Sequence, residues 1–156
     1  YRSGIELDYS WRMWQILRLY GNATWMQSRI SQYSPDGSEV VYENIAPILS
    51  PEWNVQTNLE VEIIEDLFVY ASARYLGESY LELTNDPGLT VPESFVTDFG
   101  VRFKFWKEHE IKVDLNNIFD NLYYTSGAPV ETANGVSPGY FVQPPRHLYA
   151  TLTLRF

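Results

Sequence analysis

Residues 53–63 decide the fold, and they read WNVQTNLEVEI. The odd-numbered positions carry Trp, Val, Thr, Leu, Val and Ile, whereas the even-numbered positions carry Asn, Gln, Asn, Glu and Glu. Successive side chains of a β-strand point to opposite faces, so this alternation predicts a strand with one apolar and one polar face.

The same period of two recurs in further segments, at about residues 3–10, 15–28, 66–80, 93–106, 109–124 and 140–156. We therefore expect an all-β fold, an antiparallel up-and-down meander of about seven strands in which each strand pairs with its neighbours in sequence. The alternation assigns to one face Leu59, Val61, Phe99, Val101, Phe103, Leu152 and Leu154. It assigns to the other face Glu60, Arg102, Lys104 and Thr153.

The connections between these segments are alternately short and long. Short turns are expected near residues 11–14, 65–66 and 107–108, and long polar loops near 29–51, 81–92 and 125–139. Outer-membrane barrels have short turns at one end and long loops at the other, with strands of about 9–11 residues. The pattern thus favours part of a larger transmembrane β-barrel. A soluble antiparallel sheet would share only the alternation.

The composition argues against several classes of function. The chain has 11 Lys and Arg against 20 Asp and Glu, which disfavours a nucleic-acid partner. It contains no Cys, which excludes thiolate metal sites and Cys nucleophiles. It also lacks the run of about 18 apolar residues that a transmembrane helix would need.

Few residues suggest chemistry. His109 and His147 lie far apart in the sequence, so a His metal site is not expected. Glu60 and Glu62 share a strand face as some catalytic carboxylate pairs do, but such pairs usually form a solvated face. We expect no catalytic, metal or cofactor site, and no enzymatic activity. Aromatic residues near strand ends could pack in a core or form interface girdles, namely Trp11, Trp14, Trp25, Trp53, Tyr75, Trp106, Tyr123 and Tyr140.

A more specific pattern stands near the C-terminus, where residues 116–124 read NNIFDNLYY. It resembles the Asn-Leu-Phe-Asp-x-x-Tyr pattern in the penultimate strand of TonB-dependent outer-membrane receptors, with Ile118 in place of the usual Leu. The residues that carry the resemblance are Asn117, Ile118, Phe119, Asp120, Tyr123 and Tyr124.

Residues 144–156 read PPRHLYATLTLRF and resemble the closing strand of the same family, which often has Gly where this chain has Pro145. In outer-membrane proteins, a terminal aromatic residue with apolar residues at every second position before it is a signal for the barrel-insertion machinery. The resemblance assigns the closing strand and this signal to Arg146, Leu148, Ala150, Leu152, Leu154 and Phe156.

The resemblance implies that residues 1–156 are a single partial domain, the C-terminal strands of a receptor barrel in the bacterial outer membrane. We expect the plug domain and the earlier strands of such a receptor to lie outside these residues. The implied function is uptake of a scarce nutrient: siderophore-bound iron, haem, cobalamin or a glycan. The implied partners are outer-membrane lipid, the remaining strands and plug of the same receptor, and an energy-coupling inner-membrane protein that acts through the plug.

Two other readings stay open: a small structural or adhesive outer-membrane barrel, and a soluble ligand-binding β-protein. Seven strands would close only a narrow barrel with a parallel seam, so we expect an open curved strip with residues 1–10 and 148–156 at its edges. The sequence does not identify the ligand or its binding residues. The loops are a poor surface for an anionic chelate because they are acidic, with Asp36, Glu39, Glu43, Glu82, Asp86, Glu93 and Glu131.

Overall fold

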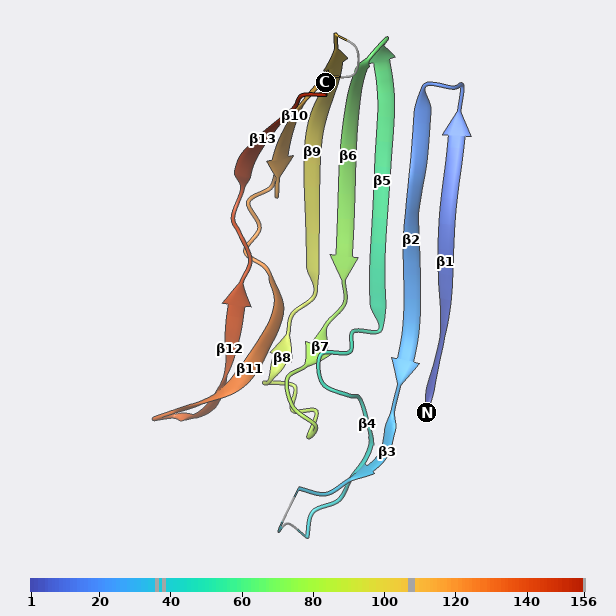
Figure 1. Ribbon diagram of the computed structural model, residues 1–156. Coiled ribbons are helices and arrows are strands. Elements are labelled where there is room, and N and C mark those ends of the chain that lie inside the picture. The colour runs from blue at the N-terminus through green and yellow to red at the C-terminus, as the bar shows by residue number, and fades with distance from the viewer. Residues whose placement is uncertain (36, 38, 107–108, 156) are drawn as a thin grey trace.

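The computed structural model describes residues 1–35, 37, 39–106 and 109–155, and no helix occurs within them. The main sheet has seven strands (Figure 1): β1 Arg2–Met13, β2 Leu17–Ser28, β5 Trp53–Ile64, β6 Leu67–Leu76, β9 Ser94–Phe105, β10 His109–Asn116 and β13 His147–Thr153. They are hydrogen-bonded in the order β1-β2-β5-β6-β9-β10-β13, and each neighbouring pair is antiparallel. The predicted up-and-down meander is confirmed.

The register of the ladders assigns side chains to two faces. Leu59 in β5 lies opposite Ala71 in β6, which in turn lies opposite Phe99 in β9. Glu60, the next residue of β5, lies opposite Tyr70 and points to the other face. The ladders of β10 and β13 extend both sets in the same way. The prediction of one apolar and one polar face is therefore confirmed for every assigned residue that lies in a strand.

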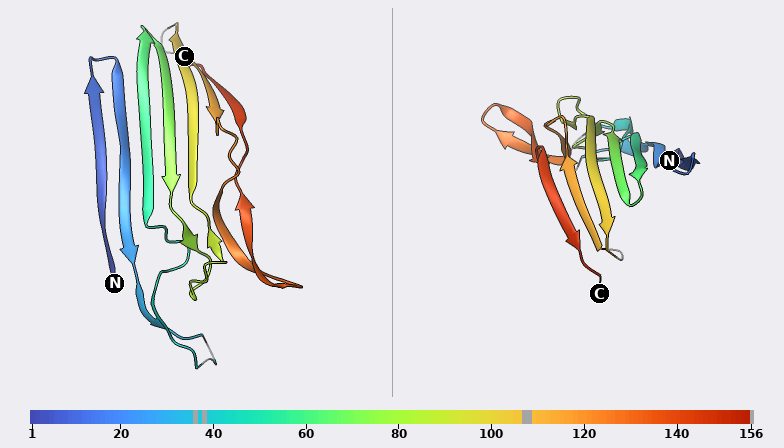
Figure 2. Two further views of the ribbon diagram at one scale, coloured as in Figure 1. Left: turned by 180° about the vertical axis from the view of Figure 1, so that it is seen from behind. Right: turned by 90° about the horizontal axis from the view of Figure 1, so that it is seen from above.

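The sheet is an open strip. Among the described residues, β1 pairs only with β2 and β13 only with β10, and no ladder joins β1 to β13. Figure 2 shows a single curved layer with these two strands at opposite edges. The structure thus agrees with the open strip expected from the odd number of strands.

The long connections, expected as polar loops, contain hairpins that were not predicted. The pairs are β3 Ile30–Tyr33 with β4 Tyr42–Ile45, β7 Ser79–Tyr80 with β8 Thr90–Val91, and β11 Tyr124–Thr132 with β12 Gly135–Val142. All three lie at one end of the sheet, which we call the loop end, and the turns at 14–16 and 65–66 lie at the other, the turn end (Figure 1). The expected turn at residues 107–108 and loop residue Asp36 lie outside the described residues.

Several element boundaries differ from the prediction, including the end of β6, which falls at Leu76 instead of residue 80. The first turn falls at residues 14–16 instead of 11–14, because the pairing of β1 with β2 continues to Met13 and Leu17. Residues 117–123, expected to continue a strand, lie outside any strand. Residues 140–142 belong to β12, so the last strand of the sheet is shorter than expected.

The buried core lies among the hairpins and not beneath the sheet. Leu81, Leu89 and Val91 are 5%, 5% and 2% exposed, and they pack against Tyr124 and Tyr140. In the described part of the chain, no second layer covers the apolar face of the main sheet. Its exposed large side chains include Ile5, Leu7, Phe95, Phe99, Phe103, Ile111, Leu148 and Leu152. An apolar surface of this extent calls for apolar surroundings.

Candidate functional site

The polar face of the main sheet carries paired charges near the turn end. Arg102 Nη2 lies 2.8 Å from Glu60 Oε2, and the Arg102 guanidinium lies 4.5 Å from the centre of the Phe68 ring. Lys104 Nζ lies 5.8 Å from the centre of the same ring. Phe68 thus supports two cations on a face that is otherwise mainly polar.

A second group on this face is built around an aromatic ring that crosses a glycine. The hydroxyl of Tyr70 in β6 reaches over Gly100 in β9 and donates a hydrogen bond to Asp114 Oδ1 in β10. Lys112 Nζ lies 3.0 Å from the same oxygen and 5.0 Å from the centre of the Tyr70 ring. Side chains of β6 and β10 therefore meet above β9 on the polar face, and only a residue without a side chain fits beneath the ring.

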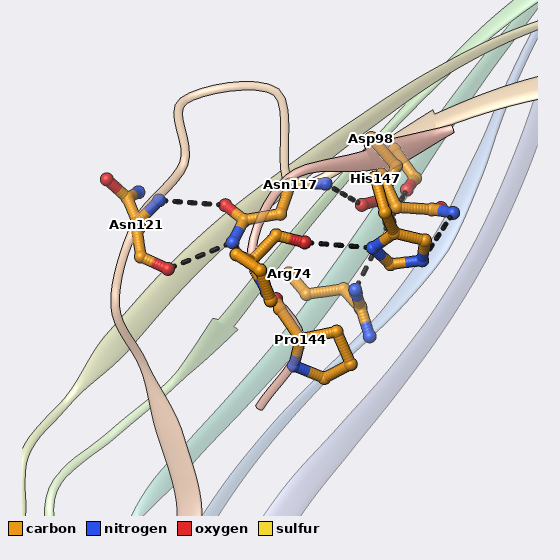
Figure 3. A network of polar contacts seen from close by, with 9 residues as sticks. Arg74, Asp98, Asn117, Asn121, Pro144 and His147 are labelled. Carbon is orange, nitrogen blue, oxygen red and sulfur yellow. Dashed lines mark hydrogen bonds and ion pairs between the residues drawn. The ribbon is translucent and has the colours of Figure 1, made fainter. Parts of the chain in front are cut away.

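Asp98 in β9 connects the sheet to the segment that follows β10 (Figure 3). Its Oδ2 accepts hydrogen bonds from Ser72 Oγ at 3.0 Å and from Arg74 Nη2 at 3.2 Å. Its Oδ1 accepts the backbone N–H of Asn117 at 2.9 Å. One carboxylate thus holds the polar face of β6 and the turn after β10 together.

Asn117 is the buried centre of this turn, with 2% exposure and a φ of 50°. Its Nδ2 donates to the carbonyl oxygens of Asn121 at 2.9 Å and Pro144 at 3.4 Å, and its Oδ1 accepts the N–H of Asn121 at 3.0 Å (Figure 3). Asn adopts positive φ more readily than most residues. The backbone and the side chain at position 117 therefore both favour Asn.

The structure brings the two C-terminal patterns together. Asp120 Oδ1 accepts the backbone N–H of Arg146 at 2.8 Å, which joins the turn to the segment leading into β13. Ile118 donates its N–H to the carbonyl oxygen of Thr97 in β9 at 2.9 Å. Asn117 and Asp120 thus hold the last strand in place from a turn, whereas the sequence suggested a position inside a strand.

Among the remaining residues of the first pattern, Phe119 lies in this turn, whereas Tyr123 and Tyr124 follow it. Tyr124 begins β11, and its ring stacks on Tyr140 of β12 with 4.2 Å between ring centres. Tyr123 accepts the N–H of Gln143 through its carbonyl oxygen at 3.1 Å. The side chain of Phe119 is 64% exposed. No contact of these three residues identifies a ligand-binding role.

The apolar side chains of the closing strand point to the face that the alternation predicted. Leu148, Ala150 and Leu152 are opposite Leu115, Val113 and Ile111 of β10. The side chains of Leu148 and Leu152 are 68% and 59% exposed on the apolar face. Leu154 lies beyond the end of β13, and Phe156 lies outside the described residues. The insertion signal stays a prediction.

Aromatic side chains gather at both ends of the apolar face. Trp25 and Trp53 lie side by side at the loop end, with 6.5 Å between ring centres. At the turn end, Phe103 stacks with Phe105 at 6.1 Å. Tyr140 instead packs in the core among the hairpins, so it belongs to neither group of aromatic side chains on the apolar face.

A hollow of about 320 Å³ lies at the loop end, where the first two long connections meet the sheet. It is lined by Arg29, Ala46, Ser50, Glu52, Trp53, Tyr75, Gly77, Glu78, Ser79, Tyr80 and Glu93. Arg29 Nη2 and Glu52 Oε1 form an ion pair of 2.7 Å there, and Tyr75 donates its hydroxyl hydrogen to Glu93 at 2.5 Å. The hollow therefore has aromatic and carboxylate walls.

The described residues offer little for metal chemistry. His147 Nε2 lies 3.2 Å from Asn116 Nδ2, and its Nδ1 lies 2.8 Å from the carbonyl oxygen of Pro145. Within the described residues, no group of three or more His, Cys, Asp or Glu could hold a metal ion. No helix formed by these residues is long and apolar enough to cross a membrane.

The structural roles of two residues with many contacts were not predicted from the sequence. Gly100 has a local signal, because a glycine inside a strand often marks a close approach of other atoms. The side-chain amide of Asn85 forms hydrogen bonds with Ala46 of a neighbouring connection. In the sequence, Asn85 lies in an Asn-Asp-Pro-Gly stretch that indicates only a turn. Its partner could not be identified from the sequence, because the two residues belong to different connections.

Comparison with known proteins identifies the fold. The siderophore receptor PiuA of Acinetobacter baumannii matches over 97% of this chain at 18% identity, with a TM-score of 0.75. The ferric yersiniabactin uptake receptor FyuA of Yersinia pestis matches over 96% at 18% identity, with a TM-score of 0.72. The ferric-catecholate import receptor Fiu of E. coli K12 matches over 96% at 18% identity, with a TM-score of 0.66.

The sheet has the fold of a barrel segment of TonB-dependent siderophore receptors. The chain spans about a fifth of these receptors: 21% of PiuA, 22% of FyuA and 20% of Fiu. No protein-family model matches the sequence, and no curated protein matches it significantly. The likeness to the siderophore-receptor segment is therefore one of fold, at low sequence identity.

Proposed function

We propose that residues 1–156 form a C-terminal part of the barrel wall of a TonB-dependent receptor that imports a scarce nutrient across the bacterial outer membrane. The observation that carries the proposal is the single-layer sheet with one exposed apolar face and one ion-paired polar face. A soluble protein would cover the apolar face with a second layer. A membrane barrel leaves that face to lipid and the other face to a polar interior.

The height of the apolar face fits a membrane. Phe95 and Phe105 lie at the two ends of the apolar side of β9, ten residues apart. At about 3.3 Å per residue and a tilt of about 40°, the run is roughly 25 Å tall, the height of the apolar band of outer-membrane barrels. The aromatic residues at both ends of this face then lie where interface girdles are found.

The same arrangement supports lipid and further barrel strands as partners, and the likeness to receptor barrels supports the plug and the coupling protein. The apolar face contacts outer-membrane lipid, and the polar face lines an interior that holds the plug of the same receptor. The free edges of β1 and β13 pair with further strands, because an unpaired strand edge in hydrocarbon costs several kcal/mol for each unsatisfied backbone group. Energy reaches the plug from an inner-membrane coupling protein.

Ferric siderophores are the ligand class that we favour. PiuA, FyuA and Fiu are receptors for siderophores or their ferric complexes, and all three share the fold of this segment. Haem, cobalamin and glycans are the alternatives. The carboxylates at the loop end favour a neutral or cationic complex over a strongly anionic one, unless basic residues of other strands offset them.

Uptake of labelled iron by the native bacterium tests this function. Iron-starved cells with and without the protein receive a panel of ⁵⁵Fe-siderophores of different charge. We expect at least one complex to enter only when both the protein and the energy-coupling inner-membrane protein are present. If removal of the protein leaves uptake of every ferric siderophore, haem, cobalamin and every tested glycan unchanged, the proposal of nutrient import by this chain is wrong.

A further inference from the structure

We propose that the three long connections form one preassembled body, in which the side chain of Asn85 joins the first connection to the second, and that they do not move as three independent loops. The connections are residues 77–93, residues 117–146 and the described residues of 29–52, which exclude 36 and 38, and together they contain the three hairpins. The inference goes beyond the proposed function and concerns the loop end alone, so it can fail while the proposed function holds.

Asn85 joins the first connection to the second through two hydrogen bonds to one residue. Its Oδ1 accepts the backbone N–H of Ala46 at 2.6 Å, and its Nδ2 donates to the carbonyl oxygen of Ala46 at 2.9 Å. A third bond joins the same two connections, from the N–H of Leu49 to the carbonyl oxygen of Tyr80 at 2.9 Å. The amide of Asn85 therefore pairs with the backbone of Ala46 as a strand neighbour would.

The position of Asn85 is itself fixed within the second connection. Its backbone has a φ of 54°, and both its N–H and its Nδ2 lie 3.3 Å from the carbonyl oxygen of Glu82. Ile45, next to Ala46, is 5% exposed. The bonded segments are thus ordered on both sides, which lowers the conformational entropy lost when they join.

The second connection is joined to the third by a hydrogen bond and by packing. Tyr140 of β12 donates its hydroxyl hydrogen to the carbonyl oxygen of Thr90 in β8 at 3.0 Å. The buried side chains of Leu81, Leu89 and Val91 pack against the stacked rings at the base of the β11–β12 hairpin. Figure 1 shows β7 and β8 between the other two connections, so the second connection links all three.

The hollow at the loop end depends on this body. Ala46 and Ser50 of the first connection, Glu78 and Tyr80 of the second, and Trp53 of the sheet all line it. Its shape therefore exists before any ligand arrives, provided that the Asn85 bonds hold. A binding partner meets a formed surface and does not need to order the loops first.

Hydrogen exchange on the intact protein in lipid bilayers tests the inference, with overlapping peptides read by mass spectrometry. In the wild type, we expect the N–H groups of Ala46, Leu49, Leu81 and Leu89 to open together as one cooperative unit. Asn85→Gly removes the side-chain bonds and relieves the positive φ. Exchange at Ala46 and Leu49 should then accelerate about tenfold or more, while Leu81 and Leu89 stay protected.

Two further variants distinguish loss of the Asn85–Ala46 hydrogen bonds from a local loosening of the second connection. Asn85→Asp keeps an oxygen that accepts the Ala46 N–H, so Ala46 should stay better protected than in Asn85→Gly. Asp86→Ala removes only the bond from the Gly88 N–H, 2.8 Å long, so exchange should rise at Gly88 and not at Ala46. Unprotected Ala46 and Leu49 in the wild type, or equal exchange in wild type and Asn85→Gly, would overturn the proposal.

Discussion

Tyr70 and Asp114 are joined by a hydrogen bond that spans the full width of β9, because Gly100 leaves room for the tyrosine ring between them. The apolar face contains a similar arrangement. There, Tyr9 in β1 lies across Gly21 in β2, and its hydroxyl is 2.6 Å from Thr57 Oγ1 in β5. Each crossing links three strands and fixes their relative register.

A side chain at position 100 should destabilise the sheet. A Cβ there would lie 2.2 Å from both Cζ and Oη of Tyr70, closer than any real contact. We expect Gly100→Ala to lower the free energy of unfolding by about 1–3 kcal/mol, the usual range for overpacking. Urea unfolding in vesicles measures it. In a Tyr70→Ser background the same substitution should cost clearly less, and an equal cost in both backgrounds would show that the ring is not the cause.

A lysine should destabilise the protein at one position of β5 and have little effect at the neighbouring position. Leu59 lies on the apolar face and Asn58 on the polar face, near the middle of the strand. Leu59→Lys should destabilise the protein in a bilayer by about 2–4 kcal/mol, the cost of a cation at the lipid midplane. Asn58→Lys is the matched control and should change stability by less than about 1 kcal/mol. Equal effects would contradict the assignment of the two faces.

Removing the Asn117 side chain should loosen the turn before the last strand. Asn117→Gly tolerates the φ of 50° but leaves the N–H and the carbonyl oxygen of Asn121 without their partner. We expect a loss of about 1–3 kcal/mol and faster exchange at the Asn121 N–H. Asn121→Ala removes a more exposed amide and keeps the backbone groups that bind Asn117, so it should cost less. If Asn121→Ala costs more stability than Asn117→Gly, Asn117 is not the residue that holds this turn together.

The alternation in the sequence was sufficient to predict the main sheet. A strand with a polar and an apolar face has a strong preference for one register, since a shift of one residue exchanges the faces. Leu59 and Glu60 could therefore be assigned to opposite faces without a structure. The turn at 14–16 could not be located, because residues 11–16 contain no Gly, Pro, Asn or Asp.

The candidate sites were predictable only in part. The NNIFDNLYY pattern drew attention to Asn117 and Asp120, but their partners, Asp98 and Arg146, come from distant segments. The β11–β12 hairpin could not be predicted from its composition, because it contains Pro129 and Pro138, which lie opposite each other. Proline normally argues against a strand, and the packing around Tyr140 could not be predicted from the sequence.

Lipid contact along β9 tests the central claim most directly. The chain has no Cys, so single cysteines at position 99 and at positions 101 to 104 can carry a nitroxide spin label in the intact protein in bilayers, once any cysteines elsewhere in that protein are replaced. Position 100 is left as Gly because a side chain there would meet the Tyr70 ring. Labels at Phe99, Val101 and Phe103 should be relaxed mainly by oxygen, which concentrates in lipid. Labels at Arg102 and Lys104 should be relaxed less by oxygen. A strict alternation is the predicted result, and uniform access of a water-soluble relaxing agent to all five positions would contradict a barrel wall in the membrane.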